Sequence, residues 1–279
     1  MALVITLALV IIVSDFNLRA RTAFDRSRRA VRLVESRGLL KKIESGLPAL
    51  KPAELMALSR EPREFPVDDF TVRLEVEPLE TRLNVNRLND LIVGGPVQEL
   101  FGALLKREQF EHRALPCALD WVDADDEPRA SGAERLDYLG EDISPRNGPF
   151  ETVDELSFVR GFRDVSAFDR IRPLLTSYGS GKIYVPAASD EMLDLFEDAY
   201  GLVARNKLED MRRYPGVTFQ LPTGSIPAAA LQSIQSILTD LPTAWRAIVI
   251  FNGAHLYVRR EYVIEREAES GAAMVRRVA

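Results

Sequence analysis

The chain has 279 residues, of which 46% are hydrophobic and 28% charged, so it can build one large domain or two smaller ones with their own cores. Its formal net charge of −6 argues against a dedicated nucleic-acid-binding protein, which usually carries a strongly basic face. One cysteine and two histidines exclude an intrachain disulfide, a cysteine-based zinc site and a histidine-rich metal centre, so metal ligands must be mostly oxygen atoms.

The N-terminal segment is apolar and is followed by a basic stretch. Residues 1–13 contain Thr6 as their single polar residue, and seven arginines follow before residue 38. Because the first glycine is Gly38 and the first proline is Pro48, we expect one long helix from about residue 2 to 44. Two interpretations are open: a plain single-pass membrane anchor, or a pilin-type helix that is apolar at its tip and continuous with a globular head.

The next part of the chain alternates between broken and regular patterns. Glycine and prolines break the helical pattern between residues 46 and 66, with a short helix expected at 53–58. Residues 70–77 alternate apolar and charged side chains, which predicts an amphipathic strand. Residues 88–119 are predicted to be helical, with a break at Gly94-Gly-Pro96. Residues 120–150 are predicted to be a loop, and a loop of this length in a compact domain tends to be functional or disordered.

Residues 151–178 are predicted to form a helix, a turn at Gly161 and a second helix. This unit resembles the helix-hairpin-helix elements that often bind DNA backbones. Its turn, Arg160-Gly-Phe-Arg163, lacks the small glycine-rich hairpin that approaches phosphates, so we favour a packing role. A further helix is expected after Ser189, which is placed to cap its first turn.

The C-terminal part is predicted to hold one more helix and then strands. The helix is expected over residues 226–241, and the strands over 245–251, 255–264 and 271–278. The predicted architecture is therefore an α+β fold in which a long helix packs on a sheet. A helical insertion lies between the first strand and the last ones.

The loop at 120–142 is strongly acidic, with nine acids and two bases. Carboxylates crowded in one loop repel each other unless a positive charge lies among them. Calcium prefers six to eight oxygen ligands in flexible geometry, so this composition suits a calcium site. The spacing does not match an EF-hand loop. The predicted metal ligands are Asp123, Asp125, Asp126, Glu134, Asp137 and Asn147.

Two alternatives to a calcium site are open for this loop: a solvated acidic loop that binds nothing, and a paired-carboxylate hydrolase site, for which the separation of the acids in space would decide. The sequence contains no nucleophile elbow, phosphate-binding loop, dinucleotide fingerprint or zinc-protease motif. We therefore predict no catalytic residues. His112 and His255 are interpreted as structural residues.

An ordered series of motifs closely resembles the K-type minor pseudopilin of the bacterial type II secretion system. The series comprises Leu119-Asp-Trp-Val-Asp-Ala-Asp-Asp126, Gly132-Ala-Glu134, Tyr138, Pro145-Arg-Asn-Gly-Pro-Phe150 and Asp154-Glu-Leu-Ser-Phe-Val-Arg-Gly161. Leu83-Asn-Val-Asn86 and Lys182-Ile-Tyr-Val-Pro-Ala-Ala-Ser189 flank it. In the second flank, Tyr184 and Pro186 replace two asparagines that are usual in the family.

The resemblance implies a pilin-like fold with a large inserted α-helical domain. The implied division is an N-terminal helix at 1–45, a first part of the pilin-like core at 46–86, the inserted domain at 87–240 and C-terminal strands at 241–279. It also implies calcium in the acidic loop, carried by the six ligands named above.

The same resemblance implies a structural, non-enzymatic protein at the tip of the pseudopilus, which starts or caps assembly for export of folded proteins. Its expected partners are the I- and J-type minor pseudopilins, the inner membrane through the N-terminal helix, and secreted proteins, with no nucleic acid. The head is expected in the periplasm and the helix as a single pass in the inner membrane. The alternatives are a membrane-anchored, calcium-dependent binding protein or hydrolase, and a DNA-binding protein.

Overall fold

The computed structural model describes residues 2–67, 70–141, 143–214, 216–222, 224–253, 256–267 and 271–278. Two predictions, on Asp142 as a loop acid and on His255, lie outside these residues. The chain divides into two compact units. The first comprises Met1–Val76, Ala247–Tyr262 and Val275–Ala279, and the second Glu77–Arg246 and Val263–Met274.

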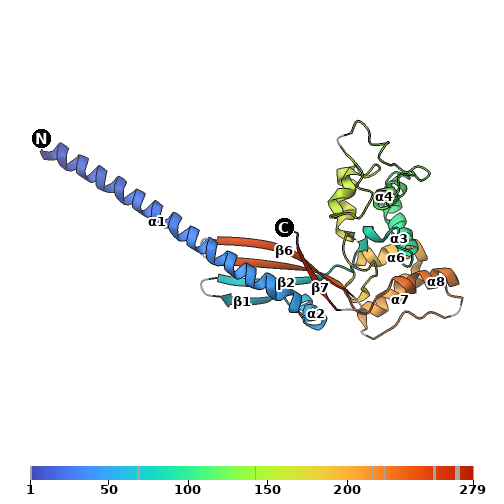
Figure 1. Ribbon diagram of the computed structural model, residues 1–279. Coiled ribbons are helices and arrows are strands. Elements are labelled where there is room, and N and C mark those ends of the chain that lie inside the picture. The colour runs from blue at the N-terminus through green and yellow to red at the C-terminus, as the bar shows by residue number, and fades with distance from the viewer. Residues whose placement is uncertain are drawn as a thin grey trace. The chain divides into compact units, whose positions relative to one another are not determined.

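One long helix opens the first unit, as the sequence predicts. Helix α1 spans Ala2–Gly46 (Figure 1). Its C-terminal part buries Ser36 and Leu40, which are four residues apart and therefore share one face of the helix. Tyr262 donates a hydrogen bond from its hydroxyl to Glu44 at 2.9 Å and so ties α1 to strand β6. The helix thus packs through one stripe of its C-terminal part.

Among the described residues, no helix combines the length and the hydropathy that a membrane crossing requires.

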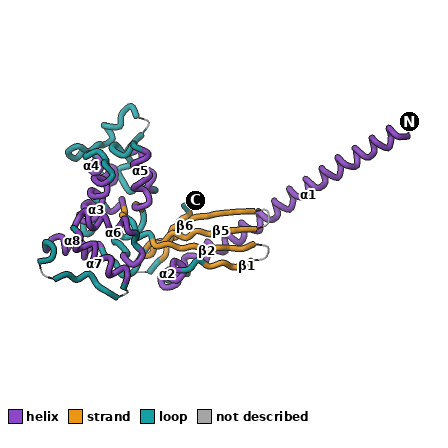
Figure 2. Tube along the Cα trace, turned by 180° about the vertical axis from the view of Figure 1, so that it is seen from behind, coloured by secondary structure: helices purple, strands orange, loops and turns teal. Residues whose placement is uncertain are grey.

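A five-stranded sheet follows in the order β1-β2-β5-β6-β7. Figure 2 shows β1, β2, β5 and β6 side by side. The first two strands pair antiparallel, from Arg63 opposite Leu74 to Val67 opposite Phe70. The strand bounds are β1 Arg63–Val67, β2 Phe70–Pro78, β5 Ala244–Gly253, β6 Leu256–Arg266 and β7 Ala273–Arg277.

Strand β1 corrects the sequence prediction, which treated this segment as irregular because of its prolines. Pro66 cannot donate a backbone hydrogen bond, but β1 is the outermost strand on its side of the sheet. Proline is tolerated on such an edge because the missing donor would not face a neighbouring strand. The strand predicted over 70–77 is confirmed as β2, with Phe70, Val72 and Val76 buried. A short helix, α2 (Pro52–Arg60), precedes both strands.

The second unit is mostly helical and has one large apolar core. Its helices are α3 Gly94–Arg107, α4 Ala114–Val122, α5 Val165–Ile171, α6 Asp190–Tyr200, α7 Leu202–Arg213 and α8 Ala228–Ile237. Two short parallel strands, β3 (Leu83–Asn84) and β4 (Leu175–Thr176), lie in the same unit. The predicted cap of α6 is confirmed, since Ser189 accepts a hydrogen bond from the backbone N–H of Met192.

Two predicted helices are corrected. The segment predicted helical over 88–119 forms two separate helices, α3 and α4, with turns between them. The first helix of the predicted helix-hairpin-helix unit is a 3₁₀ helix, Val153–Phe158, and the second is α5. From Asp123 to Thr152 the described residues contain neither a helix nor a strand, as predicted for the loop.

Buried Glu80 joins three segments of the second unit. Its carboxylate accepts hydrogen bonds from the backbone N–H and hydroxyl of Ser180, and from the backbone N–H and hydroxyl of Thr243 at 2.5 and 2.8 Å. The Glu80 carbonyl accepts a further bond from the Tyr184 N–H at 2.6 Å. Because hydrogen bonds to a charged group are stronger than neutral ones, this carboxylate fixes the chain where it enters and leaves the unit.

Gly161 brings the turn before α5 against the start of α4. Its φ is +92°, and a Cβ atom there would lie 2.7 Å from the Cα of Ala114. The unit that resembles a helix-hairpin-helix therefore uses its glycine for close packing.

We predict that Gly161→Ala lowers the free energy of unfolding by roughly 2–5 kcal/mol, because it adds overpacking to a left-handed backbone. Gly140→Ala is the matched control, since Gly140 has φ +87° and open space around its Cβ position. The control should lose only the backbone cost, roughly 1–2 kcal/mol. Urea denaturation measures both, and equal losses would contradict the packing role.

Candidate metal centre

Two carboxylates mark the point where α4 ends and the acidic loop begins. Asp120 lies in the last turn of α4 and is fully buried, and Asp123 is the C-terminal cap residue. Their neighbours Cys117, Ala118 and Trp121 are buried in the core of the second unit. Asp120 is therefore buried because the apolar face of α4 packs into this core.

Asp120 organises the segment 129–133. It accepts hydrogen bonds from the backbone N–H of Arg129 at 3.2 Å and of Ala133 at 2.8 Å. It also accepts a bond from the Arg129 guanidinium at 2.7 Å. Gly132 passes so close that a Cβ atom would lie 1.8 Å from an Asp120 carboxylate oxygen. This position requires glycine because the carboxylate occupies the space of a side chain.

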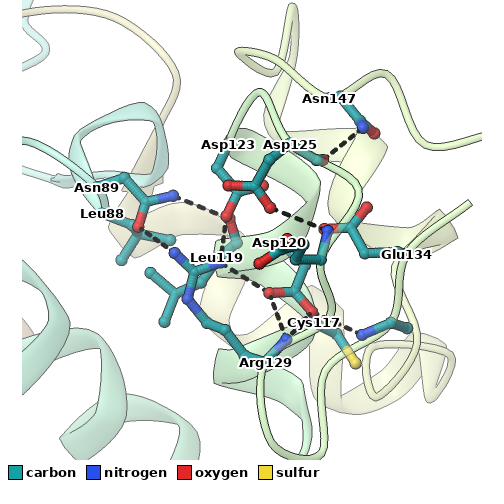
Figure 3. A network of polar contacts seen from close by, with 12 residues as sticks. Leu88, Asn89, Cys117, Leu119, Asp120, Asp123, Asp125, Arg129, Glu134 and Asn147 are labelled. Carbon is teal, nitrogen blue, oxygen red and sulfur yellow. Dashed lines mark hydrogen bonds and ion pairs between the residues drawn. The ribbon is translucent and has the colours of Figure 1, made fainter.

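Arg129 is the cation of this cluster (Figure 3). One guanidinium nitrogen contacts both Asp120 and Asp123, and another donates to the Asn89 side chain at 3.4 Å. Burial alone would lower the pKa of Arg129, but hydrogen bonds to Asp120 and Asp123 raise it overall. The guanidinium is therefore charged and bridges the two carboxylates.

Glu134 is the unusual member of the cluster. It is only 2% exposed, and both of its carboxylate oxygens lack a hydrogen-bond partner among the residues described. Burial, and then the charges of Asp123 and Asp120, raise the pKa of Glu134 to about 7. A buried carboxylate without partners is costly, so its oxygens are available to a ligand that supplies positive charge.

Two further buried oxygens of residues 120–150 lack a partner among the described residues: Oδ1 of Asp123 and Oδ1 of Asn147. Burial also raises the pKa of Asp123, although its hydrogen bond with Arg129 opposes the shift. Asn147 is held near α4, because Gly148 donates to the Trp121 carbonyl at 3.2 Å. Asp120, Asp123 and Glu134 each offer an oxygen, and these atoms lie within 4.8 Å of one another. Calcium–oxygen distances of about 2.3–2.6 Å fit this spacing.

The other three predicted ligands are exposed and already hold hydrogen bonds. Asp125 accepts from the Glu127 N–H at 3.0 Å, and Asp126 accepts from the Asn147 amide at 2.8 Å. Asp137 accepts from the Glu134 N–H at 2.9 Å. The structure thus brings Asp123 and Glu134 together and leaves an Asn147 oxygen bare. It gives Asp125, Asp126 and Asp137 roles in shaping the loop.

Asp120 is the cluster member that the sequence reasoning did not name as a ligand. It was counted among the loop acids, but the helix that carries it extends to Val122. The signal that could have found it is its position three residues before Asp123, on the same face of a helix end.

The comparisons with known proteins concern the family and the fold. Residues 81–180 match the family model described as type II secretion system (T2SS), protein K. This matched segment contains every residue of the cluster. No curated protein matches the chain.

A solved structure gives the fold. The chain is similar to a chain in the crystal structure of the GspK-GspI-GspJ complex from the type 2 secretion system of enterotoxigenic Escherichia coli, with a TM-score of 0.70 and 15% identity. The similarity covers 90% of this chain and 99% of that chain. The pilin-like α+β fold expected from the sequence is confirmed, with its long N-terminal helix and antiparallel sheet. At this identity the likeness concerns the fold.

The raised pKa of Glu134 predicts how the stability of the protein depends on pH in the presence of a chelator. Its folded pKa of about 7 exceeds the unfolded value of about 4.3, so the folded state favours the protonated form. Without a bound cation, stability should fall as the pH rises from about 4.3 to 7, by roughly 3–4 kcal/mol. Glu134→Gln should remove this loss and raise the free energy of unfolding at pH 8 in chelator.

Chemical denaturation at pH 5 and pH 8 measures the effect. Glu127→Gln is the matched control, because Glu127 is exposed in the same loop. A Glu134→Gln protein that is less stable than the wild type at pH 8 in chelator would contradict the buried-carboxylate account.

Proposed function

We propose that this protein is a minor pseudopilin of the type II secretion pseudopilus, with a structural rather than a catalytic role. The observation that carries the proposal is the protein K domain at residues 81–180. The pilin-like fold supports it, since the similarity extends over 90% of the chain.

The proposed position is the tip of the pseudopilus, in a complex with the I- and J-type minor pseudopilins. The similar chain of known structure is part of a GspK-GspI-GspJ complex, which supports the choice of partners. We place the head in the periplasm and the N-terminal helix as a single pass in the inner membrane. The apolar residues 1–13, followed by a basic stretch, support this assignment.

We also propose that the acidic loop binds calcium. The support is the set of buried oxygens on Asp123, Glu134 and Asn147 that lack a partner among the described residues. Asp120, Asp123 and Glu134 also offer oxygens that lie within 4.8 Å of one another. These three residues would hold the ion, and Asp120 would hold the loop around it. The ion would supply charge neutralisation and order to a segment without helix or strand.

The role in assembly is tested by co-expression with the I- and J-type minor pseudopilins of the same organism. We expect the three chains to co-purify as one complex, and we expect deletion of this chain to block export of the secreted proteins. The major pseudopilin, expressed in the same way, is the control. Normal export without the chain would contradict the proposed function.

The calcium site is tested by thermal unfolding of the full chain. A ligand that binds only the folded state stabilises it by about 2.7 kcal/mol at 100 times its Kd, so the melting temperature should rise with calcium. Glu134→Gln should lose most of this rise, and Glu127→Gln should keep it. Identical melting in calcium and in chelator would contradict the site.

A further inference from the structure

Arg129 occupies the same cluster that the proposed calcium ion would enter. Its guanidinium contacts Asp120 at 2.7 Å, and also Asp123, which is one of the residues that would hold the ion. It reaches a third group, the side-chain oxygen of Asn89, at 3.4 Å. We infer that Arg129 is a tethered counter-ion of this site, which holds the cation-free form together and competes with a divalent cation for Asp123. This inference rests on the proposed calcium site.

The charges of the cluster support this role. Asp120, Asp123 and Glu134 carry three negative charges when ionised, and Arg129 contributes one positive charge. Two negative charges remain among these four groups, and the nearby Asp125 and Asp126 add further negative charge. Arg135, the other base of the acidic loop, is exposed and forms no ion pair with the described residues. Arg129 therefore neutralises the site only in part and leaves a demand for a doubly charged ion.

The two carboxylates that Arg129 contacts have different surroundings. Asp120 is fully buried and is also held by the backbone N–H groups of Arg129 and Ala133, so this contact belongs to the loop itself. Asp123 has one oxygen on Arg129 and one buried oxygen without a described partner. A cation bound to Asp123 would lie close to the guanidinium and repel it. The contact with Asp123 is therefore the one that a cation weakens.

Asn89 gives the guanidinium a contact that does not involve Asp123. Its amide is fixed by a hydrogen bond to the Leu119 carbonyl at 2.9 Å, with its oxygen toward Arg129. When a cation takes Asp123, Arg129 can keep Asp120 and Asn89. A cation can thus replace Arg129 at Asp123 while segment 129–133 keeps its conformation. Because the cation must displace this contact, Arg129 lowers the affinity of the site for calcium.

The test is calorimetric titration of the full chain with calcium, in wild type, Arg129→Gln and the matched control Arg135→Gln. Both variants remove one positive charge from the same loop, but only the first removes the contacts with Asp120 and Asp123. We expect Arg129→Gln to bind calcium about tenfold more tightly, or better, because a close repulsion is removed. Arg135→Gln should change the affinity by less than about twofold because its charge is solvent-screened.

A second readout separates the counter-ion role from a merely structural one. In chelator, the melting temperature of Arg129→Gln should fall, because the carboxylates then lack their cation, and calcium should restore it.

Terbium(III) is a further probe, excited through Trp121. The loss of Arg129 leaves three charges to neutralise, so the gain in affinity should be larger for terbium(III) than for calcium.

Arg129→Lys keeps the test informative if Arg129→Gln fails to fold. Lysine retains the charge but cannot span two carboxylates and an amide. We expect this variant to bind calcium more tightly than the wild type. Wild-type affinity in both Arg129 variants, or an equal gain in Arg129→Gln and Arg135→Gln, would overturn the inference and leave the calcium site standing. Absence of calcium binding in every protein would overturn the calcium site, and this inference with it.

Discussion

The acidic loop depends on one electrostatic constraint: the buried carboxylates at the end of α4 lack enough positive charge. The loop from Asp123 to Thr152 has no described helix or strand, so backbone pairing cannot order it. Asp120 replaces that pairing by accepting backbone hydrogen bonds from Arg129 and Ala133. The same arrangement buries Glu134 beside two other acids, and Arg129 is ion-paired to both of those acids. The loop is therefore organised by charge, and the cation that we propose would complete it.

The rest of the second unit is stabilised by different interactions. A large apolar core joins α3 to α8, and Glu80 satisfies its buried carboxylate with four protein hydrogen bonds. The contrast with Glu134 is instructive, because both glutamates are almost fully buried. One has all its partners within the chain, and the other has none among the described residues. The proposed cation would therefore stabilise the loop, whereas the buried carboxylate of Glu80 is already satisfied by the chain.

Much of the fold follows from sequence patterns. The absence of early glycine and proline predicts α1, and two-residue alternation predicts β2. Strand β1 was missed because Pro66 is compatible with a strand only at a sheet edge, and edge position is set by the other strands. The composition of the loop predicts an acidic site, but only burial distinguishes the acids of the cluster from the other acids of the loop. Asp125 and Asp137 are exposed, although each is an acid only two or three residues away from a member of the cluster. Burial of Glu134 depends on the packing of the loop against α4, which local patterns do not contain.

The central claim is that the bare oxygens around Glu134 are cation ligands. The most direct measurement is a crystal structure of the protein grown with calcium, with the ion located by its anomalous scattering. We predict one ion at about 2.3–2.6 Å from oxygens of Asp123, Glu134 and Asn147, with the Arg129 contact to Asp123 lengthened. A well-ordered loop with no ion at this position, or an ion held by other residues of the loop, would contradict the account.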